Sequence, residues 1–196
     1  MPLPSLPRPG KYARVERERR FLLAGLPEDQ PATAIRKITD RYLIGTALRL
    51  RHMADEHDGH DYKFTQKIPS DCPGPVQGLI TNIYLSEPEY DLLAQLPGKV
   101  LTKTRYSVPP LGIDVFAPPL QGLVLAEAEF DGDNALLAFR LPSYVIAEVT
   151  DDARFTGGRL VNTTREELTS WLADYGINAG AEQAPGEDAR VRSPVR

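Results

Sequence analysis

The stretch Val15–Leu23, with the sequence VERERRFLL, decides how the rest of the chain is interpreted. Read as a β-strand, it places Glu16, Glu18 and Arg20 on one face, because successive side chains of a strand point to opposite sides. Such a face is an ordinary charged surface if it meets solvent. If it points inward, its charges need partners, because an uncompensated buried ion costs several kcal/mol. The interpretation therefore depends on whether other strands carry similar faces.

Four later stretches carry charged pairs of a single sign at strand spacing. They are Arg49 with Arg51, Lys63 with Lys67, Lys103 with Arg105, and Glu127 with Glu129. Taken singly, each pair also suits a solvated sheet face. Exposed sheets, however, usually mix signs to gain cross-strand pairing. Strands of uniform sign that are gathered around one lumen would give it a basic wall and an acidic wall.

Composition limits the classes of function. A length of 196 residues fits one domain, and a net charge of −4 disfavours general nucleic-acid binding. The single cysteine, Cys72, excludes an internal disulfide and suits a reducing compartment. No apolar run approaches the ~20 residues that span a bilayer. We therefore expect a cytoplasmic protein without nucleic-acid or membrane partners, and its oligomeric state stays open.

Many short strands separated by turn signals predict a mainly antiparallel sheet that closes into a barrel, in the α+β class. Residues 31–38 suggest a helical turn, and helices are expected at 88–96 and 165–175. The proline-rich leader, 1–12, and the tail, 176–196, are expected to be disordered because they offer little to bury. One folded domain over 13–175 remains.

The two predicted walls suit complementary ligands. Clustered carboxylates without His or Cys partners suit Mg²⁺ or Mn²⁺. Arg and Lys clusters suit phosphate oxygens, which Arg binds as a fork and Lys as a point charge. Together they indicate metal-assisted phosphoryl transfer. A basic lumen alone could equally be a binding site without catalysis.

The same residues resemble the CYTH domains, or triphosphate tunnel metalloenzymes. Glu16–Phe21, ERERRF, is similar to the ExExK signature that opens this family. Further matches follow in the family's order, over about residues 13–175: Tyr42–Leu43, LRLR at 48–51, Lys67, KTRY at 103–106, IDVF at 113–116, LAEAEF at 125–130 and EVTD at 148–151. The resemblance implies an eight-stranded closed tunnel with flanking helices that binds a triphosphate-containing small molecule. Family members hydrolyse inorganic, thiamine or nucleoside triphosphates, and a few are adenylate cyclases.

The resemblance also implies roles for individual residues. Metal ligands would be Glu16, Glu18, Glu127 and Glu129, holding Mg²⁺ or Mn²⁺. Substrate would be bound by Arg20, Arg49, Arg51, Lys63, Lys67, Lys103 and Arg105. Lys103 and Tyr42 would form a catalytic pair, in which the Lys lowers the pKa of the Tyr so that it can act as general base. Plain packing is the alternative for Tyr42.

Two departures from the family's pattern keep several functions open. Arg20 replaces the signature's final Lys, and the usual Arg/Glu-rich strand reads LITNIYL at 79–85, with Asn82 near the position of its last acid. Inorganic triphosphate is the default substrate, because nothing in the sequence identifies an organic-group pocket. Nucleoside or thiamine triphosphatase, adenylate cyclase and a non-catalytic polyphosphate- or nucleotide-binding module are the alternatives.

Other polar residues leave alternatives open as well. Asp114 and Glu148 would orient basic side chains or make simple ion pairs. His52, His57 and His60 would form a zinc site or an exposed hairpin, and their spacing favours the hairpin.

Overall fold

The computed structural model describes residues 10–178. Most of the predicted leader and tail therefore lies outside the described residues. The strands are β1 Arg14–Leu23, β2 Ala34–Leu43, β3 Leu48–Asp55, β4 His60–Pro69, β5 Val76–Leu85, β6 Gly98–Val108, β7 Leu111–Phe116, β8 Val124–Glu129 and β9 Val145–Glu148. The helices are α1 Glu87–Leu93, α2 Asp133–Ala138, the 3₁₀ turn η1 Ala153–Phe155, α3 Gly157–Leu160 and α4 Arg165–Ala173.

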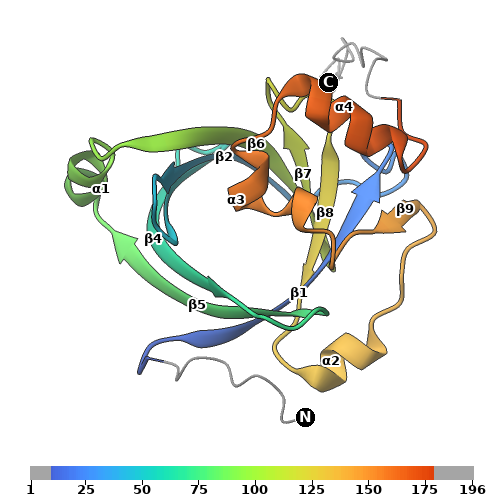
Figure 1. Cartoon of the computed structure of the whole chain (residues 1–196), viewed down its shortest axis with the longest axis horizontal. Coiled ribbons are helices and arrows are strands. Elements are labelled where there is room, and N and C mark those ends of the chain that lie inside the picture. The colour runs from blue at the N-terminus through green and yellow to red at the C-terminus, as the bar shows by residue number, and fades with distance from the viewer. Residues whose placement is uncertain (1–9, 179–196) are drawn as a thin grey trace, which may run out of the picture.

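Eight of these strands close into an antiparallel barrel (Figure 1). The hydrogen-bonded order is β5-β4-β3-β2-β6-β7-β8-β1, and an additional β5–β1 pairing joins the two ends. The short β9 pairs with the C-terminal part of β1, beyond the point where β5 leaves it. The predicted fold class, a closed eight-stranded barrel with flanking helices, is confirmed.

The barrel closes at a bulge in β1. Glu16 pairs with Gly78 of β5, and the register shifts between Glu16 and Arg17. Gly78 has φ +135°, and a side chain there would collide with the Ile68 carbonyl oxygen. Only glycine adopts this conformation readily, so Gly78 allows β4, β5 and β1 to meet closely.

Of the predicted local elements, the helical turn at 31–38 is wrong and the helices at 88–96 and 165–175 are confirmed. Residues 34–38, expected to form a helical turn, belong to β2 and pair with β6. Ile35 and Ile38 are three residues apart, a spacing that suits a helix, but pairing with β6 makes the segment a strand and puts these two side chains on opposite faces. Both predicted helices are present as α1 and α4, and Thr164 caps α4 by accepting a hydrogen bond from the Glu167 N–H.

The apolar side chains pack in two clusters, one at an end of the barrel and one on its outer face. One cluster joins inner-face residues at one end of the barrel, such as Leu101 and Phe116, to Phe155, Leu160 and Leu168 of η1, α3 and α4. A second cluster covers the outer face of β1, β7 and β8, and Phe139 and Tyr144, from the segment that follows α2, pack against it. Most of the inward side chains outside these two clusters are polar or charged. No helix among residues 10–178 is long and apolar enough to cross a membrane.

Candidate functional site

Strand register places the charged side chains on one inner face. Residues directly opposite each other in an antiparallel ladder share a face. Glu18 faces Glu129 and Arg20 faces Glu127 across β1–β8, while Arg51 faces Lys63 across β3–β4. Following these pairings around the barrel puts the predicted charged residues on the lumen side: Glu16, Glu18, Arg20, Arg49, Arg51, Lys63, Lys67, Lys103, Arg105, Glu127 and Glu129.

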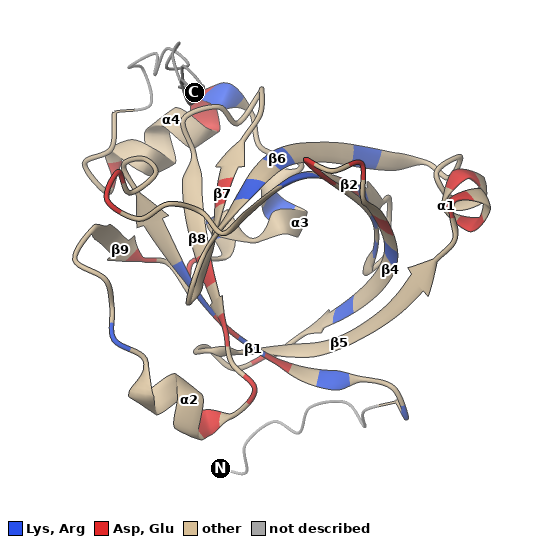
Figure 2. Ribbon diagram, turned by 180° about the vertical axis from the view of Figure 1, so that it is seen from behind, with Lys and Arg blue, Asp and Glu red and all other residues tan. Residues whose placement is uncertain are grey.

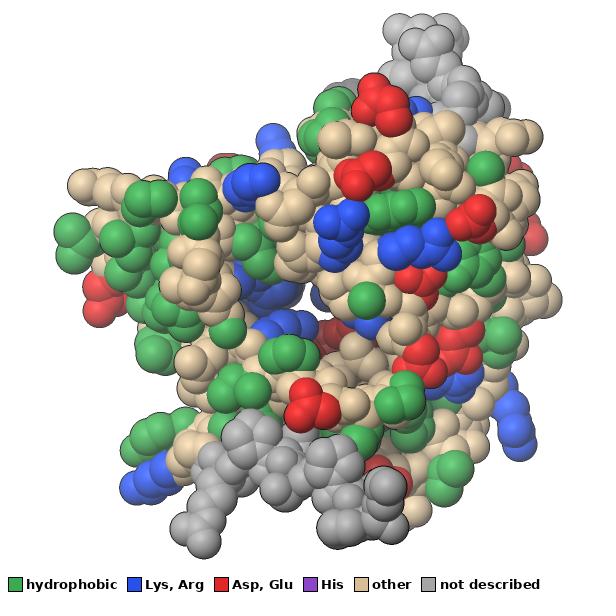
Figure 3. Space-filling model, in the orientation of Figure 1, with side chains coloured by type: hydrophobic (Ala, Val, Ile, Leu, Met, Phe, Trp, Pro, Cys, Tyr) green, Lys and Arg blue, Asp and Glu red, His purple; other side chains and the backbone are tan. Residues whose placement is uncertain are grey.

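The lumen has a basic and an acidic sector. On the ribbon, the acidic positions of β1 and β8 lie together, and basic positions lie on β4 and β6 (Figure 2). The space-filling view shows a hollow into the barrel whose wall carries Lys and Arg side chains, with acidic side chains nearby (Figure 3). An anion that entered this hollow would meet fixed positive charge on partly buried side chains, where attraction is stronger than in bulk water.

The basic sector contains a carboxylate that sequence reasoning missed. Asp40 of β2 is fully buried and accepts hydrogen bonds from Arg51 Nε at 2.6 Å and Arg51 Nη2 at 2.7 Å. Arg49 Nε lies 3.5 Å from Asp40 Oδ1. Burial opposes ionisation of Asp40, but Arg51 and Arg49 outweigh it and lower the pKa of Asp40. Its i, i+2 spacing to Tyr42 was the available signal for an inward position.

A second buried carboxylate holds the β6 cations. Asp114 of β7 is ion-paired with Lys103 and accepts two 2.7 Å hydrogen bonds from Arg105. This places Asp114 where it orients basic side chains, one of its two predicted roles. Arg105 also contacts Glu127 of β8. Because Asp114 and Glu127 outweigh the effect of burial, the pKa of Arg105 is well above its ordinary value.

The acidic side chains turn toward cations of the protein. Lys67 Nζ lies 2.6 Å from Glu16 Oε1, and Arg20 Nε lies 3.9 Å from Glu18 Oε1. Within residues 10–178, no three His, Cys, Asp or Glu side chains converge closely enough to hold a metal ion. The four predicted metal ligands therefore share a sector of the lumen, but their carboxylates are not gathered at one point.

The pKa values of Glu18 and Glu127 are shifted in opposite directions. Burial, reinforced by the Glu127 charge, raises the pKa of Glu18 to about 8. Burial also opposes ionisation of Glu127, but Arg105 and Lys103 outweigh it and lower the pKa of Glu127. Burial and the Glu127 charge therefore favour the neutral form of the Glu18 carboxyl. A positive charge placed beside Glu18 would restore its carboxylate.

Two arginines hold donors that no protein group satisfies. Arg20 Nε and Arg49 Nε are buried and have no hydrogen-bond partner in the described part of the chain. The rest of the Arg20 guanidinium is anchored, because Nη2 donates to the Thr150 carbonyl at 2.7 Å and to Gln77 at 3.0 Å. A buried donor left unpaired costs about 1–3 kcal/mol, so an acceptor from a ligand would be favoured at both positions.

Tyr42 does not have the expected chemistry. Burial, reinforced by the Asp40 charge, raises the pKa of Tyr42, so the predicted lowering by Lys103 is wrong. No hydrogen bond joins the Tyr42 hydroxyl to Lys103 among the described contacts. The hydroxyl instead abuts Gly157 of α3, where any side chain would collide with it. Tyr42 also packs against the apolar cluster at the barrel end.

The inner face of β5 is uncharged. Its inward residues are Gly78, Ile80, Asn82 and Tyr84, each opposite a β4 residue of the lumen. Thr65, fully buried, donates a hydrogen bond of 2.8 Å to Asn82 Oδ1. Tyr84 lies at the rim, with Lys63 Nζ 5.1 Å from its ring centre. The LITNIYL strand therefore makes one wall of the lumen neutral.

The remaining candidates lie outside the lumen. His52 and His60 stack on the outer wall with a 2.8 Å contact between Nε2 and Nδ1, and the described residues provide no third ligand group for zinc. Glu148 of β9 pairs with Arg19 at 2.6 Å, so it makes a simple ion pair and does not orient a lumen cation.

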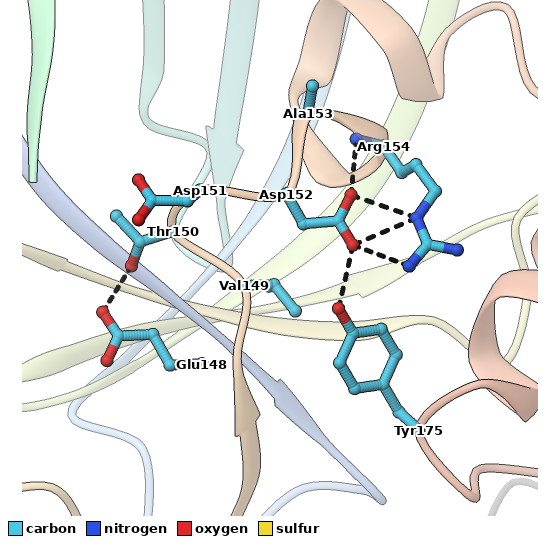
Figure 4. A pocket seen from close by; sticks show the side chains of 8 residues that line it. All are labelled: Glu148, Val149, Thr150, Asp151, Asp152, Ala153, Arg154 and Tyr175. Carbon is cyan, nitrogen blue, oxygen red and sulfur yellow. Dashed lines mark hydrogen bonds and ion pairs between the residues drawn. The ribbon is translucent and has the colours of Figure 1, made fainter. Parts of the chain in front are cut away.

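A pocket of about 610 Å³ lies between β9, η1 and α4 (Figure 4). Its central carboxylate, Asp152, is already bound by Arg154 and by the Tyr175 hydroxyl at 2.8 Å. Thr150 likewise donates to Glu148. Because these groups satisfy one another, the lumen rather than this pocket is the candidate site.

The fold and site define a closed antiparallel tunnel barrel with an interior of opposed charge. Among solved structures, the chain is similar to the inorganic triphosphatase NE1496, with 26% identity over 76% of this chain and 96% of that one and a TM-score of 0.50. A second NE1496 structure, described as a hypothetical protein, gives 28% identity over 76% and 99% of the chains and a TM-score of 0.49. A conserved hypothetical protein of Pyrococcus furiosus gives 9% identity over 83% and 91% and a TM-score of 0.40. No protein-family model and no curated protein sequence matches the chain.

Proposed function

We propose that this protein is a metal-dependent triphosphatase that hydrolyses a phosphoanhydride bond of inorganic triphosphate inside the barrel. The observation that carries the proposal is the lumen itself, in which a basic sector adjoins a sector of four carboxylates and each sector contains one buried arginine donor without a hydrogen-bond partner among the described residues. Similarity to an inorganic triphosphatase structure over most of both chains supports the same substrate class.

The basic sector would hold the substrate. Arg49 offers a buried donor, and Asp40 holds Arg51 in a fixed orientation beside it. Lys67 and Arg105 face the lumen from β4 and β6, so an extended polyanion could touch cations on several strands at once. Because phosphoryl transfer depends chiefly on positioning and neutralising charge, these fixed cations are the main catalytic contribution that the chain's own residues can make.

The acidic sector would hold Mg²⁺ or Mn²⁺ through Glu16, Glu18, Glu127 and Glu129. Oxygen donors alone suit these hard cations, and Glu18 is buried beside the Glu127 charge, so an added cation would favour its ionised form. When bound, the ion would neutralise charge on the phosphate oxygens. Glu16 and Glu127 would have to leave Lys67 and Arg105 before they could serve as ligands.

A non-catalytic binding module is the second candidate. It is favoured by the neutral inner face of β5, which lacks the charged side chains expected there, and by carboxylates that are engaged with protein cations. Such a protein would bind triphosphate tightly without consuming it.

Phosphate release separates the two candidates. Inorganic triphosphate, ATP and thiamine triphosphate are each incubated with the protein in Mg²⁺, in Mn²⁺ and in chelator. We expect metal-dependent release, fastest from inorganic triphosphate. Tight binding without release from any of the three would establish the binding module instead.

A further inference from the structure

Two ion pairs cross the boundary between the basic and acidic sectors. Lys67 of β4 holds Glu16 of β1 with Nζ and Oε1 2.6 Å apart, and Arg105 of β6 holds Glu127 of β8. Each pair joins a side chain suited to phosphate with a side chain suited to a divalent cation. Glu129, from the same acidic sector, makes no ion pair with any described residue and is exposed.

These contacts make the two ligands depend on each other. A triphosphate that drew Lys67 and Arg105 away would leave two carboxylates unpaired and facing an anion. A cation that drew Glu16 and Glu127 away would leave the Lys67 ammonium unpaired and would leave Arg105 with Asp114 as its one described carboxylate partner. In either case an opposite charge in the lumen loses its partner, which costs more than the original pair contributed.

We propose that Glu16 and Glu127 make the lumen selective for triphosphate together with a divalent cation, over either ligand alone. This inference rests on the proposed function and assigns the two residues a second role beside metal binding. With both ligands present, each ion pair is replaced by two new attractive contacts: the Lys or Arg side chain binds the triphosphate, and the Glu side chain binds the cation. With the anion alone, both exchanges leave a carboxylate uncompensated, and with the cation alone, release of Glu16 leaves the Lys67 ammonium uncompensated. By linkage, the anion and the cation must then tighten each other's binding by the same factor.

The two pairs differ in expected strength. The Lys67 side chain is 41% exposed, so solvent screens its attraction to Glu16. Arg105 and Glu127 are 19% and 17% exposed, so their pair is better shielded. Releasing Arg105 from Glu127 should therefore affect anion binding more than releasing Lys67 from Glu16.

Metal-free binding tests the proposal without relying on activity. Calorimetry in chelator measures the Kd of inorganic triphosphate for the wild type and for Glu16→Gln, Glu127→Gln and Glu129→Gln. All three variants remove one negative charge from the same sector, but only the first two break an ion pair. We expect Glu16→Gln and Glu127→Gln to tighten metal-free binding about fivefold or more beyond Glu129→Gln, which corresponds to about 1 kcal/mol. Equal effects of all three would overturn the proposal.

The reciprocal experiment uses Mn²⁺ without triphosphate. Lys67→Met frees Glu16, whereas Lys63→Met removes the same charge from the same strand without releasing a carboxylate, because Lys63 lies over the Tyr84 ring. Titration of Mn²⁺ by electron paramagnetic resonance should show tighter binding to Lys67→Met than to Lys63→Met. Identical Mn²⁺ binding by the two variants would contradict the exchange.

Wild-type protein with both ligands separates this inference from the proposed function. Failure of the wild type to bind triphosphate in the presence of Mn²⁺ would remove the proposed function as well. Normal wild-type binding with no difference between the paired and unpaired glutamates would remove only the selectivity. Should Glu127→Gln fail to fold, Glu16→Gln and Lys67→Met still decide the outcome.

Discussion

Asp40 and Arg51 form a bidentate ion pair inside the barrel, in which Asp40 is fully buried and the two hydrogen bonds are 2.6 and 2.7 Å long. Arg49 approaches the same carboxylate, so one acid compensates two guanidiniums on β3. This arrangement holds the two guanidiniums in place on the lumen wall before any ligand arrives. Rigid donors lose less freedom on binding an anion than mobile ones.

Removal of the Asp40 charge should therefore destabilise the fold. Asp40→Asn leaves two buried guanidiniums without a carboxylate, and breaking such a pair typically costs about 3–5 kcal/mol. Urea denaturation measures the loss. The matched control is Asp133→Asn, whose partner contact with Arg17 is surface-exposed and should cost at most about 1 kcal/mol. Equal losses for the two variants would mean that Asp40 does not compensate the β3 arginines.

The raised pKa of Glu18 predicts that the metal-free protein loses stability as pH rises. The folded protein retains the Glu18 proton up to a pKa of about 8, whereas the unfolded chain releases it near 4.5. The folded state thus binds more protons across this window, and its stability falls as pH increases through it. Glu18→Gln should flatten the decline in melting temperature between pH 5 and 8, and other titrating groups such as His52 contribute equally to both proteins. Parallel curves for the wild type and Glu18→Gln would contradict the shift.

The barrel could be predicted from the sequence because each strand is marked by its own residues. Strand alternation and turn residues mark each element, and single-sign pairs such as Glu127 with Glu129 identify strands whose inner face is charged. Position within the lumen was predictable for the same reason, since a period of two fixes the face. The strand at 34–38 was missed because the spacing of Ile35 and Ile38 suits a helix.

Which charged side chains pair with each other inside the lumen could not be predicted from the sequence. Asp40 lies between Thr39 and Arg41 with nothing local to show that it would compensate Arg51 and Arg49, because that contact depends on the β2–β3 register. The Lys67–Glu16 pair depends on closure between β1 and β5, which are more than fifty residues apart. The pKa of Tyr42 likewise follows from burial against α3 rather than from a neighbouring Lys.

Tyr42→Phe tests whether the phenol serves as general base. Its raised pKa keeps the hydroxyl protonated at neutral pH, so we expect kcat/KM for metal-dependent triphosphate hydrolysis to fall by less than about tenfold. A true general base typically contributes about 100-fold or more, and a loss of that size would restore the catalytic role first predicted for Tyr42. The pH dependence of kcat/KM for the same variant provides a second readout, because loss of a general base would remove the limb of the profile that reports ionisation of that base.

The most direct measurement compares wild type with Glu129→Gln for phosphate release from inorganic triphosphate in Mn²⁺, with thermal unfolding of both proteins recorded alongside. Glu129 is exposed in the acidic sector and makes no described ion pair, so its loss removes a proposed metal ligand without disturbing the lumen's own contacts. We predict metal-dependent release by the wild type, a loss of about 100-fold or more in the variant, and unchanged melting temperatures. Full activity in Glu129→Gln, or no metal-dependent release by the folded wild type, would contradict a triphosphatase with its metal site on β1 and β8.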